Sequence, residues 1–276
     1  MEAKTREVEP LQDTVPPRHQ IESDESEDED LDTHHNRQLP PTPLVNINWI
    51  DSYVQKSNVL VALHEAGQYW AQGVILGDIH GKLILNTIEI GNFYTPQWAD
   101  VLVIIITTRV PLYAMHTIAS TIISCIQPKC LSMIDSYPLP SCILPLPQKS
   151  NKQPIRYLQT YRKLQLPSAE LFSPPNMLQS LAAAFLPLAE FKKLPSTLLL
   201  LPSSHMTPPT PPRIISSPFG PPIREEWEPR VMEEFHRNLD VALGSQSTWK
   251  VNKDTSGFGK VRPLRRGDVG EGGMYL

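Results

Sequence analysis

The strongest constraint on the fold is a strand-like run followed at once by a helix-like run. Residues Asp100–Thr107 (DVLVIIIT) are apolar at every position between their polar ends, which predicts a strand covered on both faces. Pro111 comes next, and apolar residues then recur at every third or fourth position: Leu112, Met115, Ile118, Ala119, Ile122, Ile123 and Ile126. This spacing predicts an amphipathic helix over Pro111–Ile126, with the proline in its first turn. A strand followed by such a helix is half of a βαβ unit, so we expect an α/β fold.

Other segments fit the same fold class. We predict buried strands at Asn58–Leu63 and Thr197–Leu201, and helices at Pro175–Leu186 and Pro222–Leu243, the second with Pro229 in an early turn and Gly244 at its end. The expected architecture is a single sandwich-like domain with a central sheet flanked by helices. Because 18 of the 29 prolines lie between positions 138 and 222, we predict surface loops or disorder at 144–174 and 202–222.

Both ends of the chain have compositions that disfavour a packed core. Residues 1–43 hold few apolar side chains and an acidic run with eight carboxylates between positions 22 and 32, so we predict a disordered tail. Residues 244–276 are rich in glycine and partly basic, so we predict a flexible arm. The folded domain is expected over 44–243. Outside the acidic run the chain carries a net charge of +4, which is too small to indicate a nucleic-acid partner.

Hydropathy and cysteine content bear on the compartment. No run reaches the ~18–20 apolar residues of a membrane helix, and the polar start MEAK lacks the apolar core of a secretory signal, so we expect no membrane partner. Cys125, Cys130 and Cys142 are too few for a disulfide scaffold, and we expect buried, inert thiols. These features favour the cytoplasm, with the nucleus as a second compartment.

The motif Gly77-Asp78-Ile79-His80-Gly81 matches the Asp-x-His block of calcineurin-like metallophosphatases, in which both side chains bind one metal of a two-metal site. The other ligand blocks of those enzymes, GDxxDRG and GNHE, do not occur in this sequence. β-Branched residues flank the motif at 73–76 and 82–90, and aspartate and glycine are ordinary turn residues. We therefore predict a β-hairpin with its turn at 77–81 and keep the phosphatase site as an alternative.

The last three residues, Met274, Tyr275 and Leu276, form a hydrophobic–Tyr–any-residue ending. Proteasome activators and assembly factors end in this way, and their tails enter pockets between neighbouring α-ring subunits. A terminal carboxylate can pair with a lysine of such a pocket, while the tyrosine and the preceding apolar side chain fill adjacent surfaces. Nearby glycines would make the segment a flexible spacer. A frayed end that happens to finish in these residues is the alternative.

The order of elements resembles the fungal branch of proteasome assembly chaperone 1. The resemblance rests on three short blocks. These are a predicted strand at 100–105, a predicted helix at 178–186 and an apolar strand at 199–203 that ends in Pro-Ser. A helix and a tail ending in Gly-Met-Tyr-Leu follow. The resemblance covers roughly residues 44–276 in outline.

This resemblance implies an α/β subunit that pairs with a second, related chaperone and binds the α-ring of the nascent 20S proteasome. Met274, Tyr275 and Leu276 would anchor it there. The implied mechanism is binding, so we expect no enzymatic activity, no cofactor and no metal. Two other functions stay open: a metal-dependent phosphoesterase that uses Asp78 and His80, and a scaffold whose proline-rich and acidic segments bind signalling domains. The few predicted strands suggest a small core and poor solubility without the partner.

Overall fold

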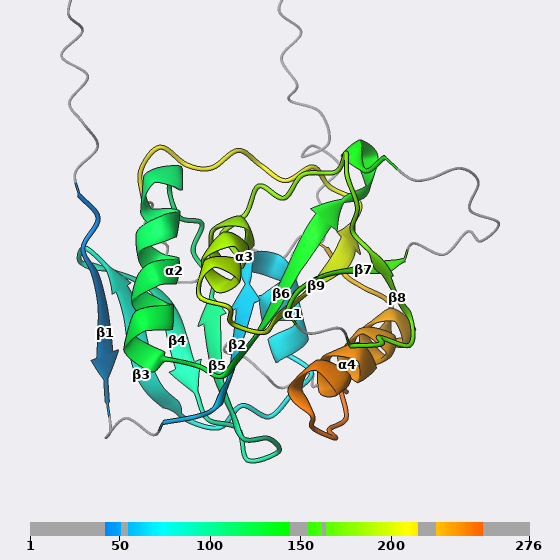
Figure 1. Ribbon diagram of the computed structural model, residues 1–276, viewed down its shortest axis with the longest axis horizontal. Helices are drawn as coiled ribbons and strands as arrows, with labels where there is room; N and C mark the ends of the chain where they lie inside the picture. The colour runs from blue at the N-terminus through cyan, green and yellow to red at the C-terminus, as the bar shows by residue number, and fades with distance from the viewer. Residues whose placement is uncertain (1–41, 51–54, 144–153, 162–163, 215–224, 251–276) are drawn as a thin grey trace, which may run out of the picture. The chain divides into compact units, whose positions relative to one another are not determined.

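A nine-stranded mixed sheet runs through the part of the chain that the computed structural model describes, residues 42–50, 55–143, 154–161, 164–214 and 225–250 (Figure 1). These residues belong to one compact unit, Thr42–Leu276. Across the sheet the strand order is β1-β3-β4-β5-β2-β6-β9-β7-β8. The strands are β1 (Val45–Trp49), β2 (Asn58–Leu63), β3 (Ile79–Leu85), β4 (Ile88–Tyr94), β5 (Val101–Ile106), β6 (Cys130–Pro138), β7 (Ile155–Thr160), β8 (Ala169–Leu171) and β9 (Ser196–Ser203).

The middle of the sheet is parallel. Strand β2 pairs in parallel with β5 on one side and β6 on the other, and β6 pairs in parallel with β9. Antiparallel strands extend this centre: β4, β3 and β1 lie beyond β5, and β7 pairs with β9. Every residue of β5 is buried, as its unbroken apolar sequence predicts. The predicted α/β fold with a central sheet flanked by helices is therefore confirmed.

Within the described residues, four α-helices cover the two faces of the sheet. Helices α2 (Leu112–Ile126) and α3 (Ala182–Phe191) pack on one face, and α1 (His64–Ala71) and α4 (Pro229–Leu243) pack on the other. Figure 1 shows α2 and α3 in front of the sheet and α1 behind it. A short 3-10 turn, η1 (Leu139–Ser141), follows β6. Because both faces of the central strands are covered, they carry few polar side chains.

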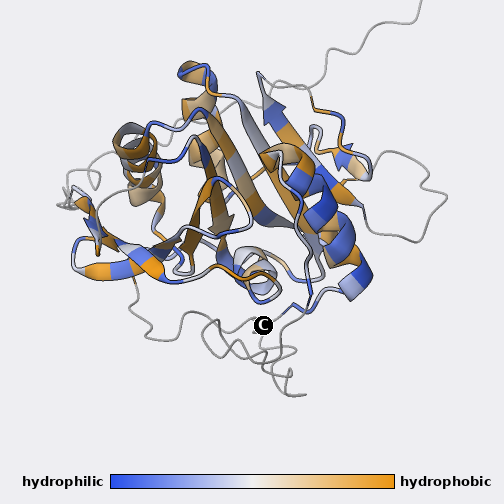
Figure 2. Cartoon of the chain, turned by 90° about the horizontal axis from the view of Figure 1, so that it is seen from below, coloured by the Kyte–Doolittle hydropathy of each residue, from blue (hydrophilic) through white to orange (hydrophobic). Residues whose placement is uncertain are grey.

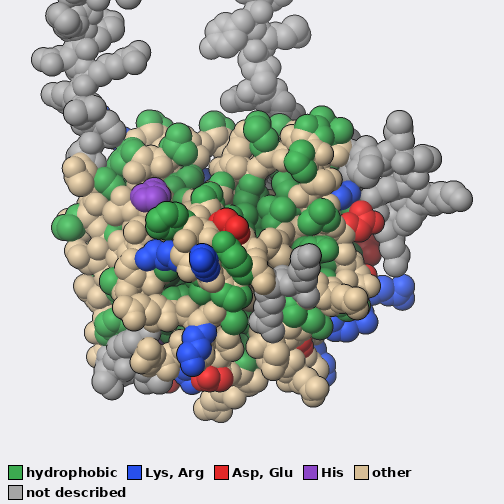
Figure 3. Space-filling model, viewed as in Figure 1, with side chains coloured by type: hydrophobic (Ala, Val, Ile, Leu, Met, Phe, Trp, Pro, Cys, Tyr) green, Lys and Arg blue, Asp and Glu red, His purple; other side chains and the backbone are tan. Residues whose placement is uncertain are grey.

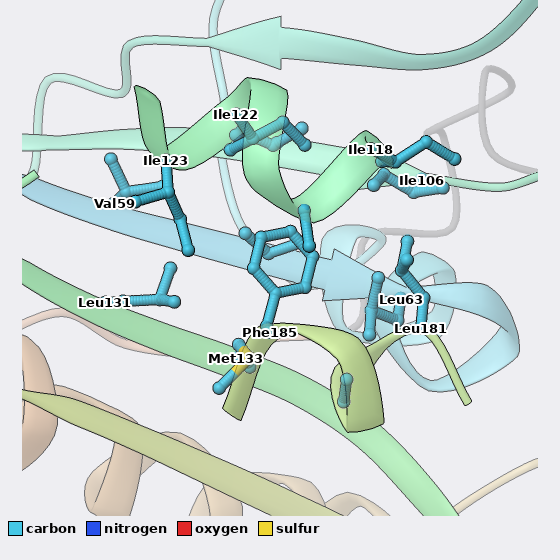
Figure 4. Packing of buried hydrophobic residues seen from close by; sticks show 14 of the residues in the cluster. Val59, Leu63, Ile106, Ile118, Ile122, Ile123, Leu131, Met133, Leu181 and Phe185 are labelled. Carbon is cyan, nitrogen blue, oxygen red and sulfur yellow. The ribbon is translucent and has the colours of Figure 1, made fainter. Parts of the chain in front are cut away.

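The core under α2 and α3 is mostly aliphatic, and Phe185 is one of its aromatic side chains. Phe185 points from α3 toward α2, whose Ile118 and Ile122 belong to the same buried cluster (Figure 4). All three side chains are fully buried. Truncating a phenylalanine in such a place costs roughly 3–5 kcal/mol, because it removes buried surface and leaves a cavity. This packing fixes α2 and α3 against the sheet.

The core under α1 and α4 is built around aromatic side chains. Trp70 of α1 is fully buried, and Tyr69, Trp227 and Trp249 are nearly so. The ring centroids of Tyr69 lie 5.2 Å from Trp227 and 6.1 Å from Trp249, which is the range for favourable aromatic pairs. Figure 2 shows the hydrophobic strands in the middle of the molecule, with much of the hydrophilic surface outside them.

Several predicted elements are confirmed nearly to the residue. Strand β2 has the predicted bounds, and β5 lies within the predicted 100–107. Helix α2 begins directly after Pro111. Helix α4 begins at Pro229, not at 222, and ends before Gly244, whose φ of +67° closes the helix in the left-handed conformation that glycine adopts without strain.

The predicted hairpin turn at 77–81 is wrong. The hairpin is formed by β3 and β4, and its two-residue turn is Asn86-Thr87, with Leu85 paired to Ile88. Asn86 takes a φ of +58°, a conformation that asparagine tolerates better than other residues with a side chain. The segment predicted as one strand, 82–90, therefore contains the end of β3, the turn and the start of β4.

The proline-rich region contains more regular structure than its composition predicts. Strands β7 and β8 lie inside 144–174, a stretch predicted to be loop or disorder, because the edge of β9 supplies pairing partners for β7. Helix α3 starts at Ala182, not at Pro175, and continues through Pro187 to Phe191. Strand β9 extends beyond the predicted 197–201 at both ends. The nine strands also contradict the expectation of a small core with few strands.

Candidate functional site

A crevice of about 300 Å³ opens at the carboxyl ends of the parallel strands. His64 and Glu65 line it directly after β2, Asp135–Pro138 line it from β6, and Ser203 lines it from β9. The chain leaves β2 into α1 on one face of the sheet, whereas the adjacent parallel strand β5 leads into α2 on the other face. Diverging connections of adjacent parallel strands leave a crevice between them, and ligands of open α/β sheets bind in such places.

Asp135 is the buried acid of this crevice. The residue is 2% exposed. Its Oδ1 accepts a hydrogen bond from the backbone N–H of Ser136 at 2.8 Å and lies 3.7 Å from Nδ1 of His64. Its Oδ2 accepts no hydrogen bond from the residues that the structure describes. The crevice therefore holds a carboxylate with an unused acceptor atom.

His64 has an unusual backbone conformation. It takes a φ of +49°, in the left-handed region that residues with a side chain rarely adopt. The cause is local, because β2 ends at Leu63 and α1 begins at His64 with no intervening loop. The sharp turn places the imidazole next to Asp135, and backbone strain of this kind concentrates at functional sites.

The protonation states of two further lining residues disfavour nucleophilic chemistry. Burial raises the pKa of Tyr137 to about 12, although the Arg156 guanidinium opposes this. Burial also raises the pKa of the Cys142 thiol, so the thiol stays protonated and is a poor nucleophile at neutral pH. The expectation of buried thiols is wrong: Cys125 is exposed, and Cys130 and Cys142 are half-buried. Cys125 lies beside the apolar stripe of α2 and not on it.

The rim of the crevice is apolar and exposed. Met177 is 75% exposed, and Ile143 and Met206 are also largely exposed. A second groove, lined by Leu112 among others, lies between the start of α2, α3 and residues 207–210. Figure 3 shows hydrophobic side chains along the upper edge of the molecule, where α2 begins and residues 204–214 cross. Contiguous exposed apolar side chains are typical of contact surfaces.

The residues after α4 pack back onto the domain. The indole N–H of Trp249 donates a hydrogen bond to the carbonyl of Trp70 at 2.9 Å, and the backbone N–H of Lys250 donates to the carbonyl of Gly73 at 3.0 Å. A Cβ on Gly73 would come within 2.1 Å of the Trp249 ring, so only glycine permits this approach. The first described residues of the predicted arm, 245–250, are thus anchored on α1.

The predicted site residues fall in different places. Met274, Tyr275 and Leu276 lie outside the described residues. Asp78 is exposed and precedes β3, and His80 is half-buried within it. The part of the chain that the structure describes contains no group of three or more His, Cys, Asp or Glu side chains that could hold a metal. It also contains no helix long and apolar enough to cross a bilayer.

Sequence reasoning missed the crevice. In the sequence, His64-Glu65 matches only the first two positions of the metal-binding motif HExxH, because residue 68 is glutamine and not histidine. Asp135 sits in β6, a strand whose serines and acid break the apolar run that predicts a strand. The one signal in the sequence was an acid directly after apolar residues, Met133-Ile134-Asp135, because a charged side chain is almost never fully buried unless it is paired.

The fold is similar to that of a solved archaeal proteasome activator. PbaB of Pyrococcus furiosus, described as an archaeal proteasome activator, matches at a TM-score of 0.51 with 12% identity, over 74% of this chain and 90% of that one. PbaA of the same organism, described as an archaeal homolog of proteasome-assembly chaperone, matches at a TM-score of 0.48 with 12% identity, over 74% and 88%. A proteasome-assembly chaperone homologue of Mycobacterium tuberculosis matches at 0.40 with 10% identity, over 68% and 86%.

Sequence comparison adds nothing to these structural matches. No protein-family model and no curated protein sequence matches the chain. At 12% identity the likeness to PbaB shows a common fold. Function has to be argued from the residues of this chain.

Proposed function

We propose that this protein is a proteasome assembly chaperone subunit that pairs with a second, related chaperone and binds the α-ring of the 20S proteasome. The observation that supports this most is the fold, because its alignment with an archaeal proteasome activator covers 90% of that protein's chain. The resemblance to fungal proteasome assembly chaperone 1 in the order of elements agrees with it. The protein acts by binding and needs no cofactor. We place it in the cytoplasm, with the nucleus as a second compartment.

The contact with the α-ring is made by Met274, Tyr275 and Leu276. The carboxylate of Leu276 pairs with a lysine between two α-subunits, and Tyr275 and Met274 fill the apolar surface beside it. A charge-assisted hydrogen bond contributes on the order of 1.5–3 kcal/mol, and burying a tyrosine adds apolar area. The position of the Leu276 carboxylate would make this short contact specific for the pocket of the α-ring.

The anchored start of the arm supports this mechanism. Trp249 and Lys250, the last described residues before 251–276, are held on the domain by hydrogen bonds to Trp70 and Gly73. A tail whose base is fixed searches a smaller volume than a free one, which raises its effective concentration at the ring once the domain has docked. Domain and tail then bind as two linked contacts.

Affinity purification of the full chain from its native cells, followed by mass spectrometry, tests the proposal. We expect enrichment of 20S α-subunits together with one further chaperone of the same fold. A matched chain that ends at Gly273 should retain the second chaperone and lose most α-subunits, because the partner contact lies on the domain. If neither α-subunits nor a second chaperone is enriched with the full chain, the proposed function is wrong.

A further inference from the structure

The proposed contact between the C-terminal residues and the α-ring gives the buried carboxylate of Asp135 no role. Burying a carboxylate nevertheless costs free energy. A buried charge is tolerated only when it is paired or fully hydrogen-bonded. Oδ1 has the backbone N–H of Ser136, at 2.8 Å. Oδ2 has no donor among the described residues. Nδ1 of His64 is 3.7 Å from Oδ1, beyond hydrogen-bonding distance.

A second unused polar atom lies in the same crevice. Ser180, just before α3, is 9% exposed, and its Oγ makes no hydrogen bond to the described residues. Both residues line the cavity. A hydroxyl can accept as well as donate a hydrogen bond. The crevice therefore offers two acceptors, one of them charged, from two different elements of the fold.

The remaining walls mix apolar and polar side chains, and Glu65 and Arg109 are among the polar ones. Met115 and Phe172 are buried, and both line the crevice beside Met177 and Leu178. A volume of about 300 Å³ is at the lower end of the range for small-molecule sites, which are mostly apolar with a few polar groups that fix orientation. A ligand that fits has an apolar body and one group that donates hydrogen bonds.

We propose that this crevice binds a small organic cation, an ammonium or guanidinium group on an apolar body. The cation donates to Oδ2 of Asp135 and Oγ of Ser180, and the body lies against Met115 and Phe172. A cation is favoured over a neutral donor because it also neutralises the buried charge. An organic cation is favoured over a metal ion because no cluster of three metal-ligating side chains exists in the described residues. This inference does not depend on the proposed function.

Three ligands with the same phenyl-alkyl body and different end groups test the charge preference: 2-phenylethylamine, 2-phenylethanol and 3-phenylpropionate. Calorimetric titration of the full chain should give the tightest binding for the amine, by roughly tenfold or more over the alcohol, and none for the carboxylate. Asp135→Asn should remove the preference for the amine, because it removes the charge and keeps the shape. Asp100→Asn, which removes an exposed carboxylate paired with Lys56, is the matched control and should bind as the parent does.

A second measurement covers the case in which Asp135→Asn does not fold. Adding the amine to the isotopically labelled parent should shift the backbone amide signals of Ser136 and Ser180 and leave that of Lys56 in place. The proposal is overturned if the amine binds no better than the alcohol, if Asp135→Asn keeps the preference, or if the shifts lie elsewhere.

Discussion

The indole N–H of Trp70 donates a hydrogen bond to Nδ1 of His236 at 3.1 Å, which joins α1 to α4 inside the protein. Because an indole nitrogen can only donate, Nδ1 must accept, and the neutral ring carries its proton on Nε2. Nε2 lies 2.8 Å from Oγ of Ser247, which in turn donates to Oδ1 of Asp240 at 2.9 Å. This chain of hydrogen bonds fixes the segment after α4 in place.

Stability should fall in mildly acidic solution because of His236. Burial lowers the pKa of His236 below its usual 6.5, and the Asp240 carboxylate opposes this only in part. The unfolded chain then binds more protons than the folded one below pH 6.5. The contribution of this neutral histidine is therefore complete above about pH 6.5 and is lost as the pH falls through that value toward the lower folded pKa.

Chemical denaturation at pH 7.5 and 5.5 measures this effect. We expect the free energy of unfolding of the parent to drop more between the two values than that of His236→Gln, whose amide can accept from Trp70 and donate to Ser247 without titrating. Equal drops in both proteins would show that other groups control the pH dependence.

Trp249 should matter for stability although it lies in the segment predicted to be flexible. Trp249→Ala removes a side chain that is 4% exposed together with its hydrogen bond to Trp70, and we expect a loss of roughly 3–5 kcal/mol in thermal or chemical unfolding. Truncating the exposed Phe191 to alanine is the control and should cost much less. A loss below about 1 kcal/mol for Trp249→Ala would mean that the anchor is not formed in solution.

The tail should control proteasome binding without affecting the fold. Removing Met274, Tyr275 and Leu276 should weaken binding to α-rings by roughly tenfold to a few hundredfold, because ~1.4 kcal/mol corresponds to one decade. Tyr275→Ala should reproduce most of the loss. The affinities are measured directly from the binding of each variant to α-rings immobilised on a surface.

One additional residue after Leu276 is the sharpest control for the tail. It keeps every side chain and moves only the carboxylate, so it should weaken binding nearly as much as the truncation. Unchanged binding of both the extended and the truncated chain would refute docking by these residues.

Asp78 and His80 should tolerate substitution. Asp78 is exposed and lies outside the hairpin turn, so Asp78→Asn and His80→Asn should each change the free energy of unfolding by at most about 1 kcal/mol. Metal content and hydrolysis of p-nitrophenyl phosphate, measured on the parent and both variants, check the alternative function. A bound metal or an activity that either variant loses would support the phosphoesterase.

The elements that the sequence predicted well are those whose pattern is complete within a short window. Strand β5 is uniformly apolar, and α2 carries its apolar residues at helical spacing after a proline. The end of helix α4 before Gly244 is predicted as well, whereas its start at Pro229 lies seven residues after the predicted one. In each case the residues that determine the structure are neighbours in the chain, so local periodicity and backbone preference are sufficient.

Other features depend on contacts between residues distant in sequence. Residues 155–160 form a strand because the edge of β9 offers backbone partners, and Trp249 is buried because Gly73 leaves room for its ring. The crevice combines His64, Asp135 and Ser180, which come from three separate parts of the chain. Local sequence determined strands β2 and β5 in the centre of the sheet, whereas it did not reveal their neighbour β6. Only the tertiary structure decided which polar side chains meet at its carboxyl edge, because strand order and crossover connections, not local propensity, bring those ends together.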